Sequence, residues 1–157
     1  DYIYAILHSK RYRNTYHAFL QNDFPVIPYP ASGEYFLTMA GYGTKLRKLH
    51  LLEGITHKDF ITRYPVSEGN DIVSTRRFEN TGNGVGKVWI NEHRYFENVP
   101  AGAWNLFISG YQPLDKWLKD RNGMQLSGDD IRHFQKMVVA QNETVNMMTE
   151  IDSYIII

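Results

Sequence analysis

The spacing of apolar residues predicts helices at both ends of the chain and a small sheet between them. Over residues 2–21, apolar side chains recur every three or four positions, which is typical of one face of an α-helix. The helix is expected to end before Pro25, because the residue that precedes a proline avoids the α region. The segment 25–30 contains three prolines and is predicted to be an extended strap.

A second amphipathic helix is predicted to begin at Ser32 or Gly33 and to stop at Gly54. Its apolar stripe has spacings of four, three, four and three residues. The stripe consists of Tyr35, Met39, Tyr42, Leu46 and Leu49. Gly41 and Gly43 each weaken such a helix by about 1 kcal/mol relative to alanine, unless close packing offsets the cost.

From about residue 60 to residue 97 the apolar period shortens to two, which is typical of β-strands. Two strand-like runs, 72–78 and 85–91, flank the glycine- and asparagine-rich segment 80–84. Asn-Gly between two such runs predicts a β-hairpin. A third short strand is expected at 94–97.

Side chains alternate between the two faces of a strand, so the run 85–91 has an apolar and a polar side. Val88 and Ile90 share one face, which is expected to be buried. Lys87, Trp89 and Asn91 share the other, and this combination is not typical of a core.

The aromatic-rich stretch 95–119 predicts a short helix or turn around Trp104 and then a helix that begins at Pro113. Taken one at a time, its aromatic side chains are most simply interpreted as core. The insert 109–112 (SGYQ) fits that interpretation less well, because it places a glycine beside donor and acceptor side chains where a ligand could approach the backbone.

Ser127 and Asp130 form a weak capping box at the start of a last long helix, expected over 128–151. These patterns together predict an α+β fold. It would consist of N-terminal helices, a small mainly antiparallel sheet with a hairpin, and a long C-terminal helix.

Composition limits the classes of function. The chain has 157 residues, 17 basic and 17 acidic side chains, and no cysteine. Disulfides, thiolate metal sites and cysteine nucleophiles are therefore excluded. No apolar run is long enough to cross a membrane, and the neutral charge does not by itself indicate nucleic-acid binding. The chain begins within a helical pattern and without methionine, so we expect it to be part of a larger protein.

Motifs for catalysis are missing from the sequence. The glycine-rich segment 82–86 lacks the Lys-Ser/Thr of a phosphate-binding loop and is interpreted as a turn. The six histidines do not have the spacing of metal ligands. No Gly-x-Ser-x-Gly elbow occurs, and the acidic pair 129–130 is explained by the dipole of the following helix.

Three stretches resemble the C-terminal region of bacterial adenine-specific DNA methyltransferases of restriction–modification systems, the Type ISP enzymes and the related Type IIG enzymes. They are DYIYAILHSKRYRNTYHAFLQNDFPVIP at 1–28, LRKLHLLE at 46–53, and the region 88–152, which contains VPAGAWNLFISGYQPLDKWLKDRNGMQLSGDDIRHFQKMV. In that family this region is the target recognition domain, which reads DNA sequence while an upstream domain transfers a methyl group from S-adenosylmethionine.

The family's catalytic tetrapeptide, Asn-Pro-Pro-Tyr, is not present, and neither a methyl-donor loop nor a Glu-x-Lys nuclease motif is found. The resemblance therefore implies no catalytic residue and no cofactor in this fragment, with S-adenosylmethionine bound by the parent enzyme. It implies double-stranded DNA and the upstream methyltransferase domain as partners, and a cytoplasmic location. We expect one domain over 1–157, in which 1–31 connects to the methyltransferase core and 32–157 forms the recognition body.

The residue types that read DNA are Arg or Lys for guanine and Asn or Gln for adenine, while Lys and Arg bind phosphates. The residues predicted to contact base edges are Arg77, Asn91, Arg94 and Gln112. The residues predicted to contact phosphates are Arg76, Lys87, Lys116, Lys119 and Arg121. Two alternatives remain open: a scaffold module that docks the methyltransferase core or another protein without binding DNA, and a stand-alone enzyme of unrecognised type.

Overall fold

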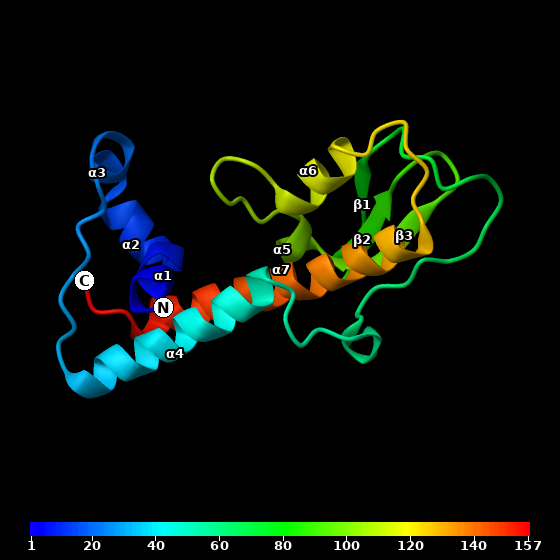
Figure 1. Ribbon diagram of the computed structural model, residues 1–157. Coiled ribbons are helices and arrows are strands. Elements are labelled where there is room, and N and C mark those ends of the chain that lie inside the picture. Colours follow the sequence, from blue (N-terminus) through cyan, green and yellow to red (C-terminus); the bar gives the residue numbers. More distant parts are fainter. The chain divides into compact units, whose positions relative to one another are not determined.

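The computed structural model describes residues 1–157, which form two units (Figure 1). Unit 1 comprises Asp1–Gly54 and Glu143–Ile157, and unit 2 comprises Ile55–Asn142. The elements in chain order are α1 (Tyr2–His8), α2 (Lys10–Thr15), α3 (His17–Asn22), α4 (Gly33–His50), η1 (His57–Asp59), β1 (Arg77–Gly82), β2 (Val85–Trp89), β3 (Tyr95–Pro100), α5 (Ala101–Trp104), α6 (Pro113–Lys119) and α7 (Gly128–Tyr154). The predicted α+β fold is confirmed, while the single domain with a division after residue 31 stays a prediction.

Three short helices, and not one, occupy the start of unit 1, so the continuous helix predicted over 2–21 is wrong in that respect. Ser9 has an extended backbone, with φ −66° and ψ 126°, which ends α1 and begins α2. Its hydroxyl accepts a hydrogen bond from the Tyr12 N–H at 3.0 Å and donates one to Asp152 at 2.7 Å. A serine can cap a new helix in this way. The apolar spacing continues across the break, so periodicity alone does not reveal it.

The strap that follows α3 has no regular secondary structure, as predicted. Two tyrosine hydroxyls hold it, because Tyr2 donates to the carbonyl of Pro28 and Tyr12 donates to the carbonyl of Val26, each at 2.9 Å. Large side chains on and next to the strap remain in solvent, and Tyr29 is 97% exposed.

The predicted second helix is α4. The Ser32 hydroxyl caps it by accepting a hydrogen bond from the Tyr35 N–H at 3.1 Å. The helix ends at His50, four residues before the predicted stop at Gly54, whose φ is +75°.

Gly43 lies in α4 directly against the backbone of Asp1, and a Cβ atom at this position would overlap that backbone. Close packing therefore accounts for this glycine, whereas Gly41 faces open space. The buried core of unit 1 consists of Tyr2, Ala5, Ile6, Tyr12, Tyr35, Met39, Leu46, Met147, Ile151 and Ile155.

In unit 2, β1, β2 and β3 form an antiparallel sheet in that order. The hairpin turn is shorter than predicted, because Gly82 still pairs with Val85 and only Asn83 and Gly84 lie between the strands. Both turn residues have positive φ, 55° and 74°. A type I′ turn requires this conformation, and Asn-Gly adopts it readily.

The first predicted strand, 72–78, is wrong in its bounds, since β1 begins at Arg77. Just before β1, Ser74 and Thr75 donate to the carbonyl of Ile90 at 2.8 and 3.1 Å, while Val73 pairs with the segment in front of α7. Val73 donates to the carbonyl of Met124 at 3.0 Å and accepts from the N–H of Gly123 at 2.7 Å. The third strand, β3, was expected at 94–97 and runs to Pro100.

Helices cover one face of this sheet. The Ser127 hydroxyl caps α7 by accepting from the Asp130 N–H at 3.1 Å, and the Asp130 carboxylate accepts from the Ser127 N–H at 2.9 Å, so the predicted capping box is confirmed. The buried core of unit 2 consists of Val73, Val88, Ile90, Phe96, Val99, Ala103, Trp104, Leu114, Leu118, Leu126, Phe134 and Val138. None of the helices is both long and apolar enough to cross a membrane.

Candidate nucleic-acid interface

The face of the sheet that is not covered by α5–α7 carries a cluster of charged and aromatic side chains, which we call the sheet face. Its members are Arg77 and Glu79 on β1, Lys87 and Trp89 on β2, and Tyr95 on β3. Cross-strand pairing aligns them, since Arg77 lies opposite Trp89, and Trp89 lies opposite Tyr95. Val88 is fully buried on the opposite side of β2, so the predicted alternation of this strand is confirmed.

Within the sheet face, cations lie over aromatic rings. The Arg77 guanidinium is 5.3 Å from the centre of the Trp89 ring, and the Lys87 ammonium is 4.4 Å from the centre of the Tyr95 ring. The Trp89 indole N–H donates to Glu79 at 2.7 Å. Such contacts orient the cations, and each contributes about 0.5–1 kcal/mol at an exposed site. The Arg77 side chain is nevertheless 58% exposed, so its donors remain accessible to a ligand.

Asn91 and Arg94, two of the predicted base contacts, are used within the protein. The Asn91 amide group donates to the carbonyls of Asn70 and Ile72 at 2.8 and 2.9 Å, and its oxygen accepts from the N–H of Arg94 at 2.8 Å. The Arg94 side chain is only 11% exposed and lies 3.5 Å from Asp71. This geometry favours a structural role for both side chains in the connection between β2 and β3.

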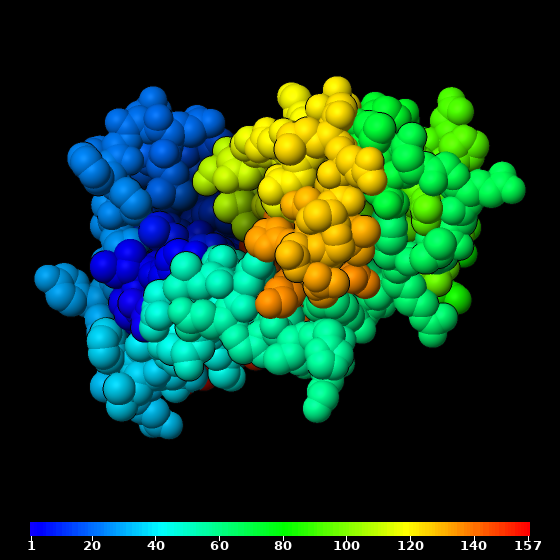
Figure 2. Space-filling view, turned by 45° about the vertical axis from the view of Figure 1, so that its right-hand side comes forward, coloured from blue at the N-terminus to red at the C-terminus, as the bar shows by residue number.

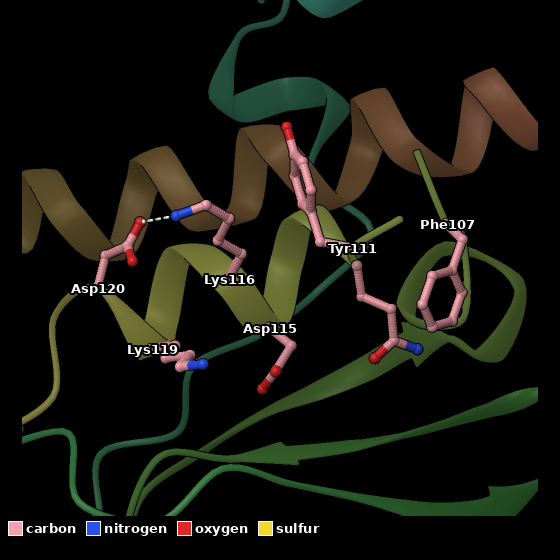
Figure 3. A pocket seen from close by; sticks show the side chains of 7 residues that line it. Phe107, Tyr111, Asp115, Lys116, Lys119 and Asp120 are labelled. Atoms are coloured by element: carbon pink, nitrogen blue, oxygen red, sulfur yellow. Dashed lines mark hydrogen bonds and ion pairs between the residues drawn. The ribbon is translucent and has the colours of Figure 1, made fainter. Parts of the chain in front are cut away.

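A second candidate surface lies along α6, and we call it the α6 surface (Figure 3). It surrounds a cavity of about 330 Å³. The residues that line the cavity are Phe107, Tyr111, Gln112, Asp115, Lys116, Lys119 and Asp120. Gln112, the residue before α6, makes no capping hydrogen bond with its side chain.

Charge on the α6 surface is only partly neutralised. Lys116 donates to Asp120 at 2.7 Å, which raises the pKa of Lys116 and lowers the pKa of Asp120 (Figure 3). Lys119 is exposed and forms no salt bridge or side-chain hydrogen bond, although its charge contributes to the lowered pKa of Asp120. Lys119 is thus free to bind an anion, whereas Lys116 would have to share its charge with Asp120.

An ion pair joins Arg76, the residue before β1, to α6. The Nε atom of Arg76 donates to Asp115 at 2.9 Å. The side chain of Arg76 is 24% exposed and that of Asp115 is 32% exposed. Arg77 is the next residue after Arg76, and Gln112 lies one helical turn before Asp115. The ion pair therefore links the two segments that carry the predicted base contacts Arg77 and Gln112, which are far apart in the sequence, although the two side chains lie on different surfaces.

Arg121 stacks on the ring of Trp117, with its guanidinium carbon 3.6 Å from the ring centre, and it lies 3.6 Å from Asp130. The ring of His133 also stacks on Trp117, with the ring centres 5.7 Å apart. Burial, and after it the charge of Arg121, lowers the pKa of His133. The loop after α6 (yellow) and the first turns of α7 (orange) are adjacent at the surface of unit 2 (Figure 2).

In the loop before α6, the sequence set the insert 109–112, with Tyr111, apart from the core but gave no indication that Phe107 is exposed. Phe107 is 58% exposed and Tyr111 is 45% exposed, while Trp104 in the same stretch is buried as expected. The signal was the insert Ser109-Gly110 between them, because two turn-forming residues in an aromatic run indicate a projecting hairpin.

The structure contains no group of three or more His, Asp or Glu side chains that could hold a metal ion. What the two surfaces offer is an arrangement of donors and cations, without a nucleophile and general base in contact. Such an arrangement can bind and select a ligand.

Comparison with known families matches residues 1–150 to the family described as the Type ISP C-terminal specificity domain. Comparison with curated proteins gives no match.

Solved structures that share the fold include three protein–DNA complexes. A nuclease-deletion mutant of the Type ISP restriction–modification enzyme LlaGI, in complex with a DNA substrate mimic, matches with 19% identity and a TM-score of 0.66 over 95% of this chain and 13% of that chain. The DrdV–DNA complex matches with 20% identity and a TM-score of 0.71 over 95% and 17%. The ATP-dependent Type ISP restriction–modification enzyme LlaBIII, bound to DNA, matches with 19% identity and a TM-score of 0.61 over 99% and 11%. The chain thus spans less than a fifth of each of these proteins.

Proposed function

Because the chain belongs to the Type ISP C-terminal specificity domain family, we propose that it recognises the base sequence of duplex DNA for a restriction–modification enzyme. The observation that carries this proposal is the family match over residues 1–150, which includes all of unit 2. The solved relatives support it, since each is described with DNA or a DNA substrate mimic.

In this proposal Arg77 and Gln112 read base edges. An arginine can donate two hydrogen bonds to guanine, and a glutamine can donate to and accept from adenine. Support comes from the accessible Arg77 side chain, from the uncommitted Gln112 side chain, and from the Arg76–Asp115 ion pair between them. The proposed phosphate contacts are Lys87, Lys116, Lys119 and Arg121.

The remaining predicted contacts would require the loss of bonds within the protein. Asn91 and Arg94 would have to leave the β2–β3 connection, and Arg76 would have to leave Asp115. We therefore propose that these three residues contribute to recognition by holding the surfaces in place, and that direct contacts are strongest at the residues named above.

Catalysis belongs to another part of the parent protein in this proposal. An upstream domain would transfer the methyl group from S-adenosylmethionine to adenine, in the cytoplasm, and residues 1–31 would connect to it. The support is the small share of the relatives' chains that this domain spans, 11–17%, together with the lack of catalytic motifs in the sequence.

The experiment is selection of bound duplexes from a randomised DNA pool, followed by sequencing and by affinity measurements across a salt series. A specific sequence should be enriched, and Arg77→Ala or Gln112→Ala should relax the choice at one position by about 1–3 kcal/mol. The matched control is Arg132→Ala, because Arg132 is also an exposed arginine next to one carboxylate, with 59% exposure against 58% for Arg77.

Phosphate contacts are separable from base contacts in the same measurements. Lys119→Ala should weaken binding to all sequences and should reduce the slope of log affinity against log salt by about one unit. The proposal is refuted if the chain binds no duplex at low salt, or if the bound duplexes show no enrichment of any base sequence over the starting pool.

The exposed strap in unit 1 favours a second candidate function, a docking module for another domain. Phe24, Val26 and Tyr29 are 88%, 64% and 97% exposed, and a cluster of large apolar side chains in solvent is typical of an interaction surface. Tyr29→Ser would then weaken a complex with the upstream domain and leave DNA selection unchanged. A scaffold without any DNA affinity would form that complex and show no salt-dependent binding of DNA.

A further inference from the structure

The loop between α5 and α6 forms a small hairpin that points two aromatic side chains into solvent. Ile108 and Tyr111 exchange two backbone hydrogen bonds, at 2.9 and 3.2 Å. Ser109 and Gly110 form the turn between them, with φ values of 52° and 86°. A two-residue turn with both residues at positive φ is the type that closes tight β-hairpins, so the tip has a defined conformation.

The tip is anchored at both ends. Leu106 and Leu114 are buried in the protein, whereas Phe107 and Tyr111 between them are 58% and 45% exposed. Ser109 in the left-handed region is unusual for a residue with a side chain, and such a conformation persists only where the surroundings maintain it. A strained, anchored turn that exposes two aromatic rings indicates a binding element.

The chemistry around the tip suits one kind of partner. Phe107 and Tyr111 line the same cavity as Lys116 and Lys119, with Tyr111 and Phe107 near the start of α6 and Lys119 near its end (Figure 3). Apolar side chains next to cations occur in proteins that insert a wedge between base pairs while the cations bind the flanking phosphates.

We propose that the tip hairpin, residues 107–111, is a wedge that partly unstacks one base step of the target duplex. This inference rests on the proposed function and extends it to a second mode of recognition. Base steps differ in how easily they are unstacked, and pyrimidine–purine steps open most easily. The wedge makes the protein sensitive to the deformability of a step in addition to the base edges read by Arg77 and Gln112.

The experiment compares two duplexes of the same sequence, one intact and one with a single abasic site that has already lost stacking. The wild-type chain should bind the abasic duplex about tenfold more tightly, because part of the cost of unstacking has been removed. Phe107→Ala and Tyr111→Ala should each reduce this preference towards one. They should keep the salt dependence of binding to the intact duplex, since neither side chain is charged.

Two further variants control for the fold and for loss of an aromatic ring in general. Gly110→Val keeps both rings but places a branched residue at a φ of 86°, so it should disrupt the turn and reduce the preference as well. Tyr29→Ala removes a ring that is 97% exposed in unit 1 and should leave the preference unchanged. Thermal unfolding should be close to that of the wild type for the Phe107 and Tyr111 variants.

The possible results separate the wedge from the proposed function. If the wild type binds intact DNA with the expected salt dependence but has no preference for the abasic duplex, the wedge is refuted and DNA recognition stands. The wedge is also refuted if the tip variants keep the full preference, as they would if the tip contacted a protein. If the wild type binds neither duplex, the proposed function fails and the wedge fails with it.

Discussion

The ion pair between Arg76 and Asp115 is expected to position the two base-reading residues, and a double-mutant cycle can measure this. The changes are Arg76→Ala, Asp115→Ala and the combination of both. If the pair holds β1 against α6, removal of either partner releases Arg77 from its fixed place relative to Gln112. Sequence discrimination should then decrease, although neither removed side chain touches DNA in this interpretation.

The magnitude follows from the geometry. The Arg76 and Asp115 side chains are 24% and 32% exposed, and their donor and acceptor atoms are 2.9 Å apart. A hydrogen bond to a charged group contributes about 1.5–3 kcal/mol, and screening by solvent at this exposure leaves a coupling energy of about 1 kcal/mol. The side chains of Lys116 and Asp120 are 49% and 54% exposed, and their charged atoms are 2.7 Å apart. Solvent screens this pair more strongly, so its coupling energy should be clearly smaller.

Urea unfolding of the four proteins in each cycle gives the two coupling energies, and selection from a DNA pool gives the discrimination. Arg76→Ala should reduce discrimination and leave the salt slope unchanged. A phosphate contact by Arg76 predicts the opposite result, a slope reduced by about one unit with discrimination intact. The reasoning is refuted if the Arg76–Asp115 coupling does not exceed that of the exposed pair, or if the salt slope falls.

Three further predictions concern stability. In the folded state, burial and the neighbouring His8 lower the pKa of His50 to about 4. The unfolded chain therefore binds more protons than the folded chain, and the thermal midpoint should fall as the pH decreases from about 6.5 towards 4. His50→Gln should flatten this pH dependence in calorimetric scans. Gly43→Ala should destabilise the protein in urea titrations because its Cβ would overlap backbone, whereas Gly41→Ala should stabilise it by about 0.5–1 kcal/mol. Phe134→Ala removes a fully buried ring and should cost about 3–5 kcal/mol of unfolding free energy, while Phe24→Ala, at 88% exposure, should change the same measurement by less than about 0.5 kcal/mol.

Local chemistry decided which elements could be predicted from the sequence. The long helix α7 was predicted within a few residues because its capping box is local, and Pro113 marked the start of α6 for the same reason. The break at Ser9 was missed because a distant residue, Asp152, accepts a hydrogen bond from that serine. Contacts between residues far apart in the sequence leave no trace in periodicity.

The candidate site shows the same limit. Alternation along β2 correctly separated Lys87 and Trp89 from the buried residues, since alternation is a property of the strand itself. Alternation could not show that the Asn91 amide, on the same predicted face, donates hydrogen bonds to backbone carbonyls of the loop before β1. Nor could it show that Arg76 faces Asp115, because 39 positions separate the two residues.

The division of unit 1 into two segments of the chain has a consequence for biosynthesis. Its core combines Tyr12, Tyr35 and Met39 with Met147 and Ile151, so this core cannot close until residues 143–157 have left the ribosome. Unit 2 is continuous and can fold earlier. At about 5–20 residues per second, the apolar residues of the first segment wait on the order of ten seconds for their partners. During this interval their apolar surface is exposed to solvent, which is the condition under which nascent chains aggregate or bind chaperones.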